Sequence, residues 1–154
     1  PRALPMAVAN SALLAMTKMG MHVTLAHPEK FELQEGIMNM AGDFAGESGG
    51  SVEVVHDRLE AAADADVIYA KSWGSLLRYD DPAAEQDLRD SLKDWVVDSE
   101  MMSRTRRAYF MHCLPVRRNV VVNDEVIDSN RSVVLQEAEN RLHAQKAILE
   151  WIFS

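Results

Sequence analysis

The chain has 154 residues, with 24 acidic and 16 basic side chains and a formal net charge of −8. This length fits one domain with a sizeable core, and an apolar fraction of 47% excludes a disordered chain. The acidic balance argues against a nucleic-acid-binding protein, the single cysteine against a disulfide framework, and the short apolar runs against a membrane span. A reducing, cytoplasmic compartment is therefore expected.

Apolar periodicity predicts helices that alternate with short strands. In chain order we expect a helix over 5–19 ending at Gly20, a strand over 21–26, a helix over 33–47, a strand over 52–55, a helix over 57–63, a strand over 67–70, a helix over 83–92, a strand over 95–97, a helix over 100–106, a strand over 108–111, a helix over 124–127, a strand over 133–135 and a helix over 137–153.

This alternation is typical of βαβ units. The expected fold class is α/β, a three-layer, doubly wound domain with a mainly parallel sheet. It is Rossmann-like but lacks a Gly-x-Gly-x-x-Gly dinucleotide loop, so no dinucleotide cofactor is expected. No repeat or linker interrupts the pattern, and we expect one compact domain over 1–154.

In an open α/β sheet, ligands bind beyond the carboxyl ends of the strands. Three of the segments that follow predicted strands carry unusual chemistry, namely 71–74 (KSWG), 112–115 (HCLP) and 137–141 (EAENR). His112 and Cys113 are adjacent on an extended strand and point to opposite faces, so they do not form a nucleophile and base. Two buried residues before a turn-forming Pro115 are the plain alternative.

Cations in these segments suit an anionic or amide ligand. Arg141 lies near the predicted start of the last helix, where a cation opposes the helix dipole, and an ion pair with Glu137 or Glu139 is the alternative to ligand binding. Lys71 beside Ser72 and Trp73 could hold a carboxylate or amide, or could be a surface lysine next to a packed indole. Arg117 and Arg118 read more simply as a solvated basic loop. His22, His27 and His56 are scattered without metal-ligand spacing, so no metal site is expected.

Taken together, the two motifs at 112–115 and 137–141 resemble the ornithine-type transcarbamylases, and the resemblance runs over nearly the full chain. Within that family, HCLPVRRNV at 112–120 and YAKSWG at 69–74 resemble the N-acylornithine branch. The resemblance implies two domains, of which this chain corresponds to the carboxyl-terminal, acceptor-binding half. The carbamoyl-phosphate-binding half, with its Ser-x-Arg-Thr-type loop, is absent from the printed sequence, so we expect the chain alone to be inactive.

The resemblance also implies residue roles. Cys113 and the backbone of Leu114 would lie against the carbamoyl group and the attacking amine, and Arg141 would bind carbamoyl phosphate. Lys71, Ser72, Trp73 and Asn10 would hold the acceptor. His112 and Pro115 would be supports. The family implies a cytoplasmic homotrimer in arginine biosynthesis, without metal, cofactor, nucleic acid or membrane.

The acceptor stays open at this point. Lys71 stands where ornithine enzymes have an acidic residue, which fits an acceptor with an acylated, uncharged α-nitrogen. Val121 is apolar as in succinyl-type enzymes, whereas 7–11, 71–74 and 140–143 are more acetyl-like. We favour N-acetylornithine over N-succinylornithine and plain ornithine. A non-catalytic amino-acid-binding module and a generic structural or partner-binding domain are the alternatives from other classes.

Overall fold

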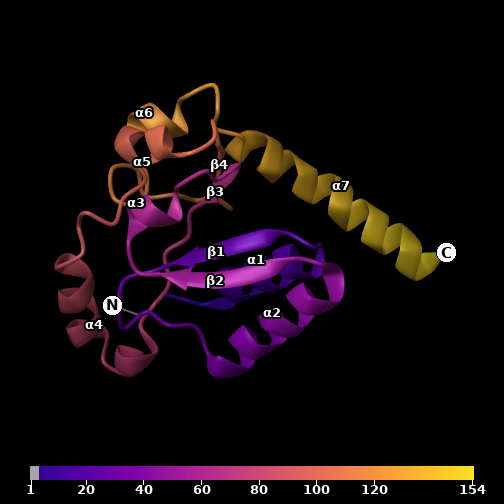
Figure 1. Ribbon diagram of the computed structural model, residues 1–154. Coiled ribbons are helices and arrows are strands. Elements are labelled where there is room, and N and C mark those ends of the chain that lie inside the picture. The colour runs from indigo at the N-terminus through magenta and orange to yellow at the C-terminus, as the bar shows by residue number, and fades with distance from the viewer. Residues whose placement is uncertain (1–3) are drawn as a thin grey trace. The chain divides into compact units, whose positions relative to one another are not determined.

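The structure is a computed structural model that describes residues 4–154. The chain forms two compact units (Figure 1). The first comprises the residues up to Ala63 together with Lys71–Trp95, and the second comprises Asp64–Ala70 and Val96–Ser154. The first unit contains α1 (Ala7–Lys18), β1 (His22–Ala26), α2 (Glu35–Ser48), β2 (Ser51–Val55), α3 (Arg58–Ala61), the 3-10 helix η1 (Leu76–Arg78) and α4 (Pro82–Asp90). The second contains β3 (Val67–Tyr69), α5 (Ser99–Arg104), β4 (Tyr109–Met111), α6 (Asp124–Ile127) and α7 (Val134–Phe153).

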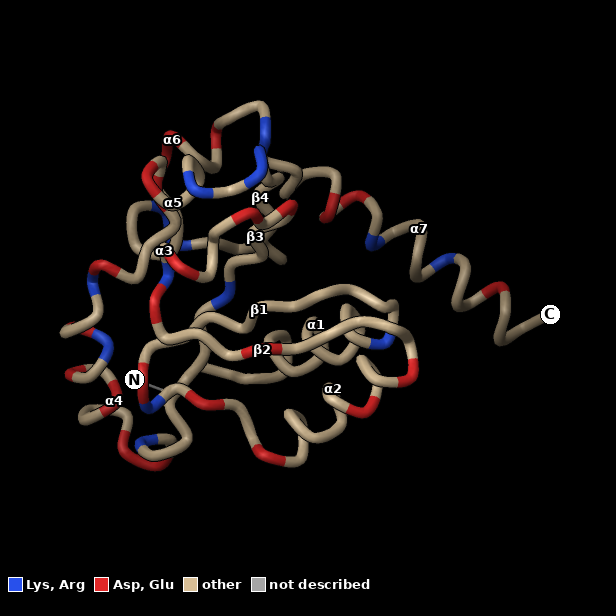
Figure 2. Tube along the Cα trace, viewed as in Figure 1, with Lys and Arg blue, Asp and Glu red and all other residues tan. Residues whose placement is uncertain are grey.

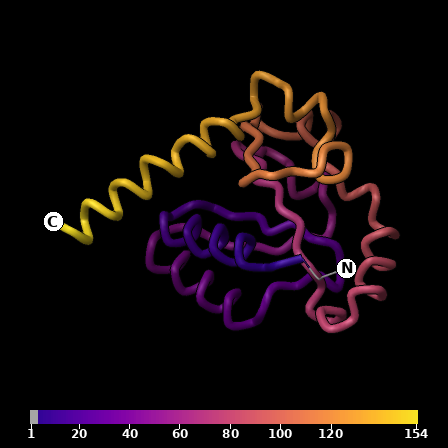
Figure 3. Tube along the Cα trace, turned by 180° about the vertical axis from the view of Figure 1, so that it is seen from behind, coloured from indigo at the N-terminus to yellow at the C-terminus, as the bar shows by residue number. Residues whose placement is uncertain are grey.

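The first unit is built on a parallel strand pair. β1 and β2 pair from His22 opposite Ser51 to Ala26 opposite Val55. Helices α1 and α2 pack against each other and against these strands, and they lie side by side when seen from the front and from behind (Figures 1 and 3). The core between them holds the buried residues Met6, Ala9, Leu13, Leu33 and Ala41.

Two glycines allow the tight connections around this strand pair. Gly20 ends α1 with a φ of +78°, the left-handed conformation that suits glycine at a helix end. A Cβ on Gly50 would lie 2.5 Å from the backbone oxygen of Met21, so no larger residue fits where β2 begins beside β1. The helix end expected at Gly20 is therefore confirmed.

Aspartate side chains begin three of the helices. Asp57 accepts hydrogen bonds from the backbone of Leu59 and Glu60 at the start of α3. Asp81 caps α4 through Ala84, and Asp98 caps α5 through Met101. Each carboxylate satisfies amide groups that the first helical turn leaves unpaired, which fixes where these helices start.

The second unit is built on the parallel pair β3–β4, with Val67 opposite Tyr109 and Tyr69 opposite Met111. Its core includes Ile68, Phe110 and Val122 from the strands and loops and Met102 and Val126 from α5 and α6. The strands expected at 95–97 and 133–135 were wrong. In the first segment Val97 makes one isolated parallel bridge, with Val122. No bridge lies within 133–135, since Ser132, just before that segment, is the residue that bridges Phe110.

The residues after Ser132 explain why no strand forms at 133–135. Past Ser132 the chain turns into α7 at Val134, because the stretch 135–147 is rich in Leu, Gln, Glu and Ala, which favour helix. The α/β class and the parallel pairing are confirmed, in the form of two two-stranded sheets within the described residues. No helix in residues 4–154 is long and apolar enough to cross a membrane.

Candidate functional site

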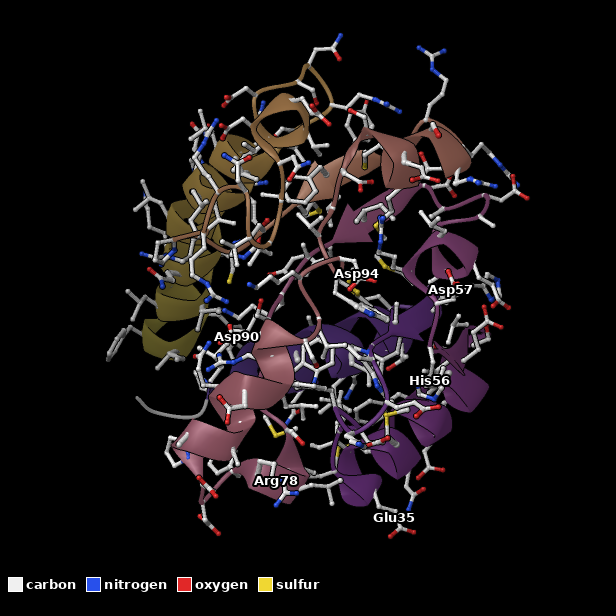
Figure 4. All side chains as sticks on the ribbon, turned by 90° about the vertical axis from the view of Figure 1, so that its left-hand side faces the viewer. Glu35, His56, Asp57, Arg78, Asp90 and Asp94 are labelled. Atoms are coloured by element: carbon white, nitrogen blue, oxygen red, sulfur yellow. The ribbon has the colours of Figure 1, made fainter. Side chains whose placement is uncertain are left out.

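The carboxyl ends of β1 and β2 bring two histidines together. The ring centroids of His27 and His56 lie 4.9 Å apart, edge to face. The Nδ1 of His56 hydrogen-bonds the backbone oxygen of His27 at 2.9 Å, and Figure 4 shows His56 next to Asp57 where β2 leads into α3. The two histidines are 29 positions apart in the sequence, and the fold brings them together because parallel neighbouring strands end at the same edge. Within residues 4–154 no group of three or more metal-binding side chains forms.

Trp73 is held by the loop that follows β1. Its indole Nε1 donates a hydrogen bond to the backbone oxygen of Phe31 at 2.8 Å, and its ring packs against the first unit's core. Two residues later, the buried hydroxyl of Ser75 donates to the backbone oxygen of Lys30. The indole N–H is therefore already used, and Trp73 can meet a ligand only with its ring.

Two other predicted acceptor residues of the first unit keep their polar groups available. Asn10 is half-buried on α1, and its Oδ1 is shielded from solvent yet accepts no hydrogen bond from the described residues. Lys71 is half-buried and makes no salt bridge within residues 4–154. A shielded amide oxygen and an unpaired ammonium both favour contact with a polar ligand. Ser72 beside Lys71 is half-buried as well.

In the second unit, His112 supports the loop that follows β4. His112 is buried, and its Nδ1 accepts a hydrogen bond from the backbone N–H of Leu114 at 3.0 Å. The accepting Nδ1 carries no proton, so the neutral ring has its proton on Nε2. Cys113, the next residue, is half-buried and free of any disulfide. The opposite orientations expected for His112 and Cys113 agree with this difference in burial.

Leu114 has a strained backbone. Its φ is +40°, in the left-handed region that residues with a Cβ rarely adopt, at a cost of about 1–3 kcal/mol. The hydrogen bond to His112 helps to hold this conformation. Pro115, which follows, is exposed. Strain of this kind is concentrated where a protein fixes backbone groups for ligand binding.

Tyr69 joins β3 to the start of α7. Its hydroxyl donates a hydrogen bond to Glu137 Oε1 at 3.1 Å. Burial raises the pKa of Tyr69 well above its usual range, and the nearby carboxylate of Glu137 raises it further because a phenolate beside it would be repelled. Tyr69 therefore stays a neutral hydroxyl at physiological pH.

Arg118 is not available to a phosphate. Its guanidinium bonds the carboxylate of Asp124, the first residue of α6, and that of Asp128, which follows the helix. Hydrogen bonds from Asn119 and Arg118 lower the pKa of Asp124. The side chain expected to be a solvated cation is thus the centre of a surface network at α6.

Arg141 makes no salt bridge within the described residues and is exposed on α7. The helix begins at Val134, three residues earlier than predicted, so Arg141 lies about 10 Å along it, beyond the reach of its terminal dipole. The ion pair considered with Glu137 does not form, since Glu137 bonds Tyr69. Glu137 and Arg141 are four residues apart and therefore share one face of α7. Along the helix, two acidic residues come first, two basic residues follow, and one more acidic residue comes near the end (Figure 2).

Residues 6–152 match the family described as aspartate/ornithine carbamoyltransferase, Asp/Orn binding domain. The chain belongs to this carbamoyltransferase family. Solved structures of relatives match the chain with a TM-score of 0.93 and confirm its α/β, Rossmann-like fold.

Individual relatives are similar over the same stretch. The chain is 48% identical over 150 residues to N-acetylornithine carbamoyltransferase of Xanthomonas campestris pv. campestris. This match covers 97% of this chain and 44% of the relative. It is 45% identical over 143 residues to ornithine carbamoyltransferase of Pyrococcus abyssi, covering 92% and 44%. A crystal structure of acetylornithine transcarbamylase complexed with acetylcitrulline matches with a TM-score of 0.93 at 48% identity, covering 97% of this chain and 45% of that one. The chain thus spans less than half the length of these relatives.

Two residues near the segment 112–115, Tyr69 and Glu137, could not be identified as site residues from the sequence. The sequence pattern places Tyr69 in a strand and offers Glu137 only as an ion-pair partner for Arg141. An alternating strand pattern does not reveal that a tyrosine hydroxyl reaches a residue 68 positions away. The available signal was topological, because β3 and β4 were both predicted and both end beside the segment 112–115.

Proposed function

We propose that this chain is the acceptor-binding half of an enzyme that transfers the carbamoyl group from carbamoyl phosphate to the δ-amine of N-acetylornithine, in arginine biosynthesis. Two features of the second unit carry the proposal, namely the strained loop at Leu114 that follows Cys113, and Arg141 on α7, which makes no salt bridge within the described residues. A cation and a loop that carries a thiol suit a small anionic substrate whose carbonyl carbon is attacked.

The proposed chemistry is one addition followed by one elimination. The lone pair of the δ-amine attacks the carbamoyl carbon, and the carbonyl oxygen becomes an oxyanion. The carbon–oxygen bond to phosphate then breaks, phosphate leaves with the electron pair, and the nitrogen loses a proton. Arg141 donates to the carbonyl oxygen as its charge grows, while Cys113 and the backbone of Leu114 fix the carbamoyl group and the amine. His112 and Pro115 support this loop.

The acceptor is assigned to residues of the first unit. Lys71 and Ser72 provide donors for its carboxylate or acyl oxygen, the Asn10 Oδ1 accepts from an N–H, and the Trp73 ring bounds the aliphatic chain. A cation at Lys71 disfavours a charged α-amine, which supports an N-acylated acceptor over free ornithine. The similarity to acetylornithine enzymes supports the acetyl group, although one solved relative was complexed with carbamyl phosphate and N-succinyl-L-norvaline.

The rest of the proposal concerns the longer enzyme. We assign carbamoyl-phosphate binding mainly to an amino-terminal half, and a homotrimer and a cytoplasmic location to the assembled protein. The unpaired cysteine is in keeping with a reducing compartment. The chemistry requires no metal or organic cofactor, since no redox step occurs and the leaving phosphate needs only cationic donors.

The test is an assay of the full-length polypeptide that contains this chain, with carbamoyl phosphate and each of N-acetylornithine, N-succinylornithine and ornithine. Release of phosphate together with formation of the carbamoylated acceptor is measured for each. Turnover that favours N-acetylornithine supports the proposal. Turnover with ornithine alone overturns the role of Lys71, and a folded protein that turns over none of them overturns the enzyme assignment.

Plain ornithine carbamoyltransferase is the second candidate, because relatives of that name are 43–45% identical to this chain.

A non-catalytic amino-acid-binding module is the alternative from another class, and calorimetry on the 154-residue chain distinguishes it from the enzyme. Tight binding of an acceptor by this chain, without turnover in the full-length protein, would favour the module.

A further inference from the structure

The loop over residues 27–33, which leads from β1 toward α2, holds the segment that contains Trp73. The indole Nε1 of Trp73 donates a hydrogen bond to the backbone oxygen of Phe31 at 2.8 Å, and the hydroxyl of Ser75 donates to the backbone oxygen of Lys30. Both acceptors are backbone groups. The position of Trp73 therefore depends on the conformation of this loop rather than on the identity of one side chain in it.

The loop contains a strained turn. Lys30 has a φ of +72°, in the left-handed region that residues with a Cβ rarely adopt. Its backbone N–H donates to Glu32 Oε1 at 3.1 Å, and the backbone N–H of Phe31 donates to the backbone oxygen of Pro28 at 3.3 Å. The side chains of Phe31 and Leu33 are buried. Strained turns persist only where the surrounding structure holds them, so the contacts at the start of the loop matter for its shape.

His27 begins the loop and also meets the ring of Trp73. Its imidazole is 2% exposed, and its Nδ1 donates a hydrogen bond to the backbone oxygen of Pro28 at 2.9 Å, since a carbonyl oxygen can only accept. The ring centroids of His27 and Trp73 lie 6.2 Å apart with an interplanar angle of 69°, edge to face. The indole is thus held at its N–H by the loop backbone and at its ring by His27.

His56 holds His27 from the neighbouring strand. Its Nδ1 donates to the backbone oxygen of His27 at 2.9 Å, and the two rings meet edge to face with centroids 4.9 Å apart. The backbone N–H of His27 donates to the backbone oxygen of Val55 at 3.2 Å. Both backbone groups of His27 are therefore bonded to the strand end at Val55 and His56. His56 itself is exposed, so its replacement leaves the core intact.

We propose that His27 and His56 are positioning residues for Trp73, which fix the plane of the indole ring that bounds the aliphatic chain of the acceptor. This inference rests on the proposed function, which assigns that role to the Trp73 ring. Because the indole N–H is already donated to Phe31, Trp73 contributes only through its face. An apolar contact weakens steeply as the surfaces separate, so a loosened indole lowers the affinity for the acceptor and leaves carbamoyl phosphate unaffected.

His56→Phe tests the inference, because it keeps a flat ring and removes the donor to the oxygen of His27. In the full-length polypeptide we expect the KM for the acceptor to rise about 3- to 10-fold, the effect of one lost hydrogen bond. We expect kcat and the KM for carbamoyl phosphate to stay within about twofold of wild type. His56→Ala removes the same donor without adding an apolar ring, and the same changes are expected.

Two further variants separate positioning from a general effect of substitution. His56→Asn places an amide N–H where the Nδ1 donor was, and it should return the KM for the acceptor to within about twofold of wild type. His22→Phe is the matched control, since His22 is also exposed and its Nδ1 is hydrogen-bonded to Ser51 Oγ at 2.9 Å at the other end of the same strand pair. An unchanged acceptor KM in His56→Phe, or equal rises for both substrates, overturns the inference.

Nuclear magnetic resonance tests the same link without turnover. The 154-residue chain has three tryptophans, and Trp95→Phe and Trp151→Phe identify the indole N–H signal of Trp73 by elimination. We expect this N–H to exchange with solvent about 3- to 10-fold faster in His56→Phe than in wild type or His22→Phe, with the other two indoles unchanged. Unchanged exchange at Trp73 overturns its positioning by His56.

The two measurements distinguish failure of the inference from failure of the proposed function. Turnover by wild type, with neither the acceptor KM nor the exchange rate changed in His56→Phe, overturns the inference alone. Absence of turnover in wild type with every acceptor overturns the proposed function and the role of the indole in acceptor binding. Exchange at Trp73 then still decides whether His56 fixes the indole.

Discussion

In the proposed site, replacement of Arg141 should lower kcat most. Its charge has no partner among the described residues and is therefore available to the substrate. We predict that Arg141→Ala in the full-length enzyme lowers kcat by about 10²–10³-fold, the usual loss when a donor to a developing oxyanion is removed. Steady-state kinetics measure this loss. The control is Arg104→Ala, since Arg104 is an exposed arginine whose nearest carboxylate, on Glu100, is 3.8 Å away. Near-normal turnover of Arg141→Ala would remove Arg141 from the chemistry.

Lys71 should act on the acceptor rather than on carbamoyl phosphate. We predict that Lys71→Ala raises the KM for the acceptor by about tenfold or more, the effect of losing a charged hydrogen bond, with a much smaller effect on the KM for carbamoyl phosphate. Lys93→Ala, on an exposed surface of the same unit, is the control. Equal increases for both substrates would contradict an acceptor-specific role.

Tyr69 should resist ionisation in alkali. Its pKa is raised above the ordinary tyrosine value of 10.0, first by burial and then by Glu137. Because the folded value is the higher one, this group stabilises the fold fully below pH 10.0, and that contribution is lost as the pH rises through the folded value. We predict that the ultraviolet phenolate titrations of wild type and Tyr69→Phe coincide until the pH is above 10.0. A difference that develops below that pH would show a tyrosine exposed to water.

The loop that precedes α6 offers a prediction for a whole element. The pKa of Asp124 is lowered by Asn119 and then by Arg118, so its stabilising contribution is present above the ordinary value of 3.8 and is lost as the pH falls through the lower folded value. Arg118→Met removes the cation and should flatten the acid limb of a plot of urea midpoint against pH. Arg104→Met is the control and should keep the wild-type slope. An identical acid limb in Arg118→Met would mean that the network contributes nothing.

Elements were predictable from the sequence where local pattern and tertiary pairing agree. Strands β1 and β2 and helices α1 and α2 follow from apolar periodicity and from Gly20 and Gly49 at helix ends. The segment 133–135 looks apolar and β-branched, but pairing stops after Ser132 and the following residues favour helix, so the strand was wrong. The loops at 71–74 and 112–115 were found as site candidates because strand ends can be located from sequence.

The side-chain partnerships inside the site could not be predicted in the same way. Which acid Tyr69 reaches depends on the register of β3 against β4 and on the first turn of α7, and neither is encoded within a few residues of Tyr69. Likewise, the pairing of Arg118 with Asp124 and Asp128 depends on a loop closing on itself. Charged residues near one another in sequence allowed several pairings, and only the fold selects one.

At the scale of the whole molecule, α7 carries apolar side chains that its own unit does not cover. Only Val134 of this 20-residue helix is buried, whereas Trp151 is 81% exposed and Phe153 is 83% exposed. The exposed apolar residues of α7 are Leu135, Leu142, Ile148, Leu149, Trp151, Ile152 and Phe153. At about 100° per residue, Leu135, Leu142, Leu149 and Phe153 lie on one side of the helix, and Trp151 lies on the opposite side. Exposed apolar residues in this number favour association with another apolar surface.

We therefore predict that the 154-residue chain self-associates through α7, so that the fraction of chains in oligomers rises with protein concentration. Leu142 and Leu149 lie seven residues apart on one side of the helix. Replacing both by Glu keeps helix propensity and should shift the sedimentation-velocity profile to that of the monomer. The matched control is Leu77→Glu, because Leu77 is 68% exposed in the first unit and lies outside α7. Equal association of the α7 double variant and wild type would place the self-association surface elsewhere. A wild-type chain that stays monomeric at every concentration would show that α7 tolerates water.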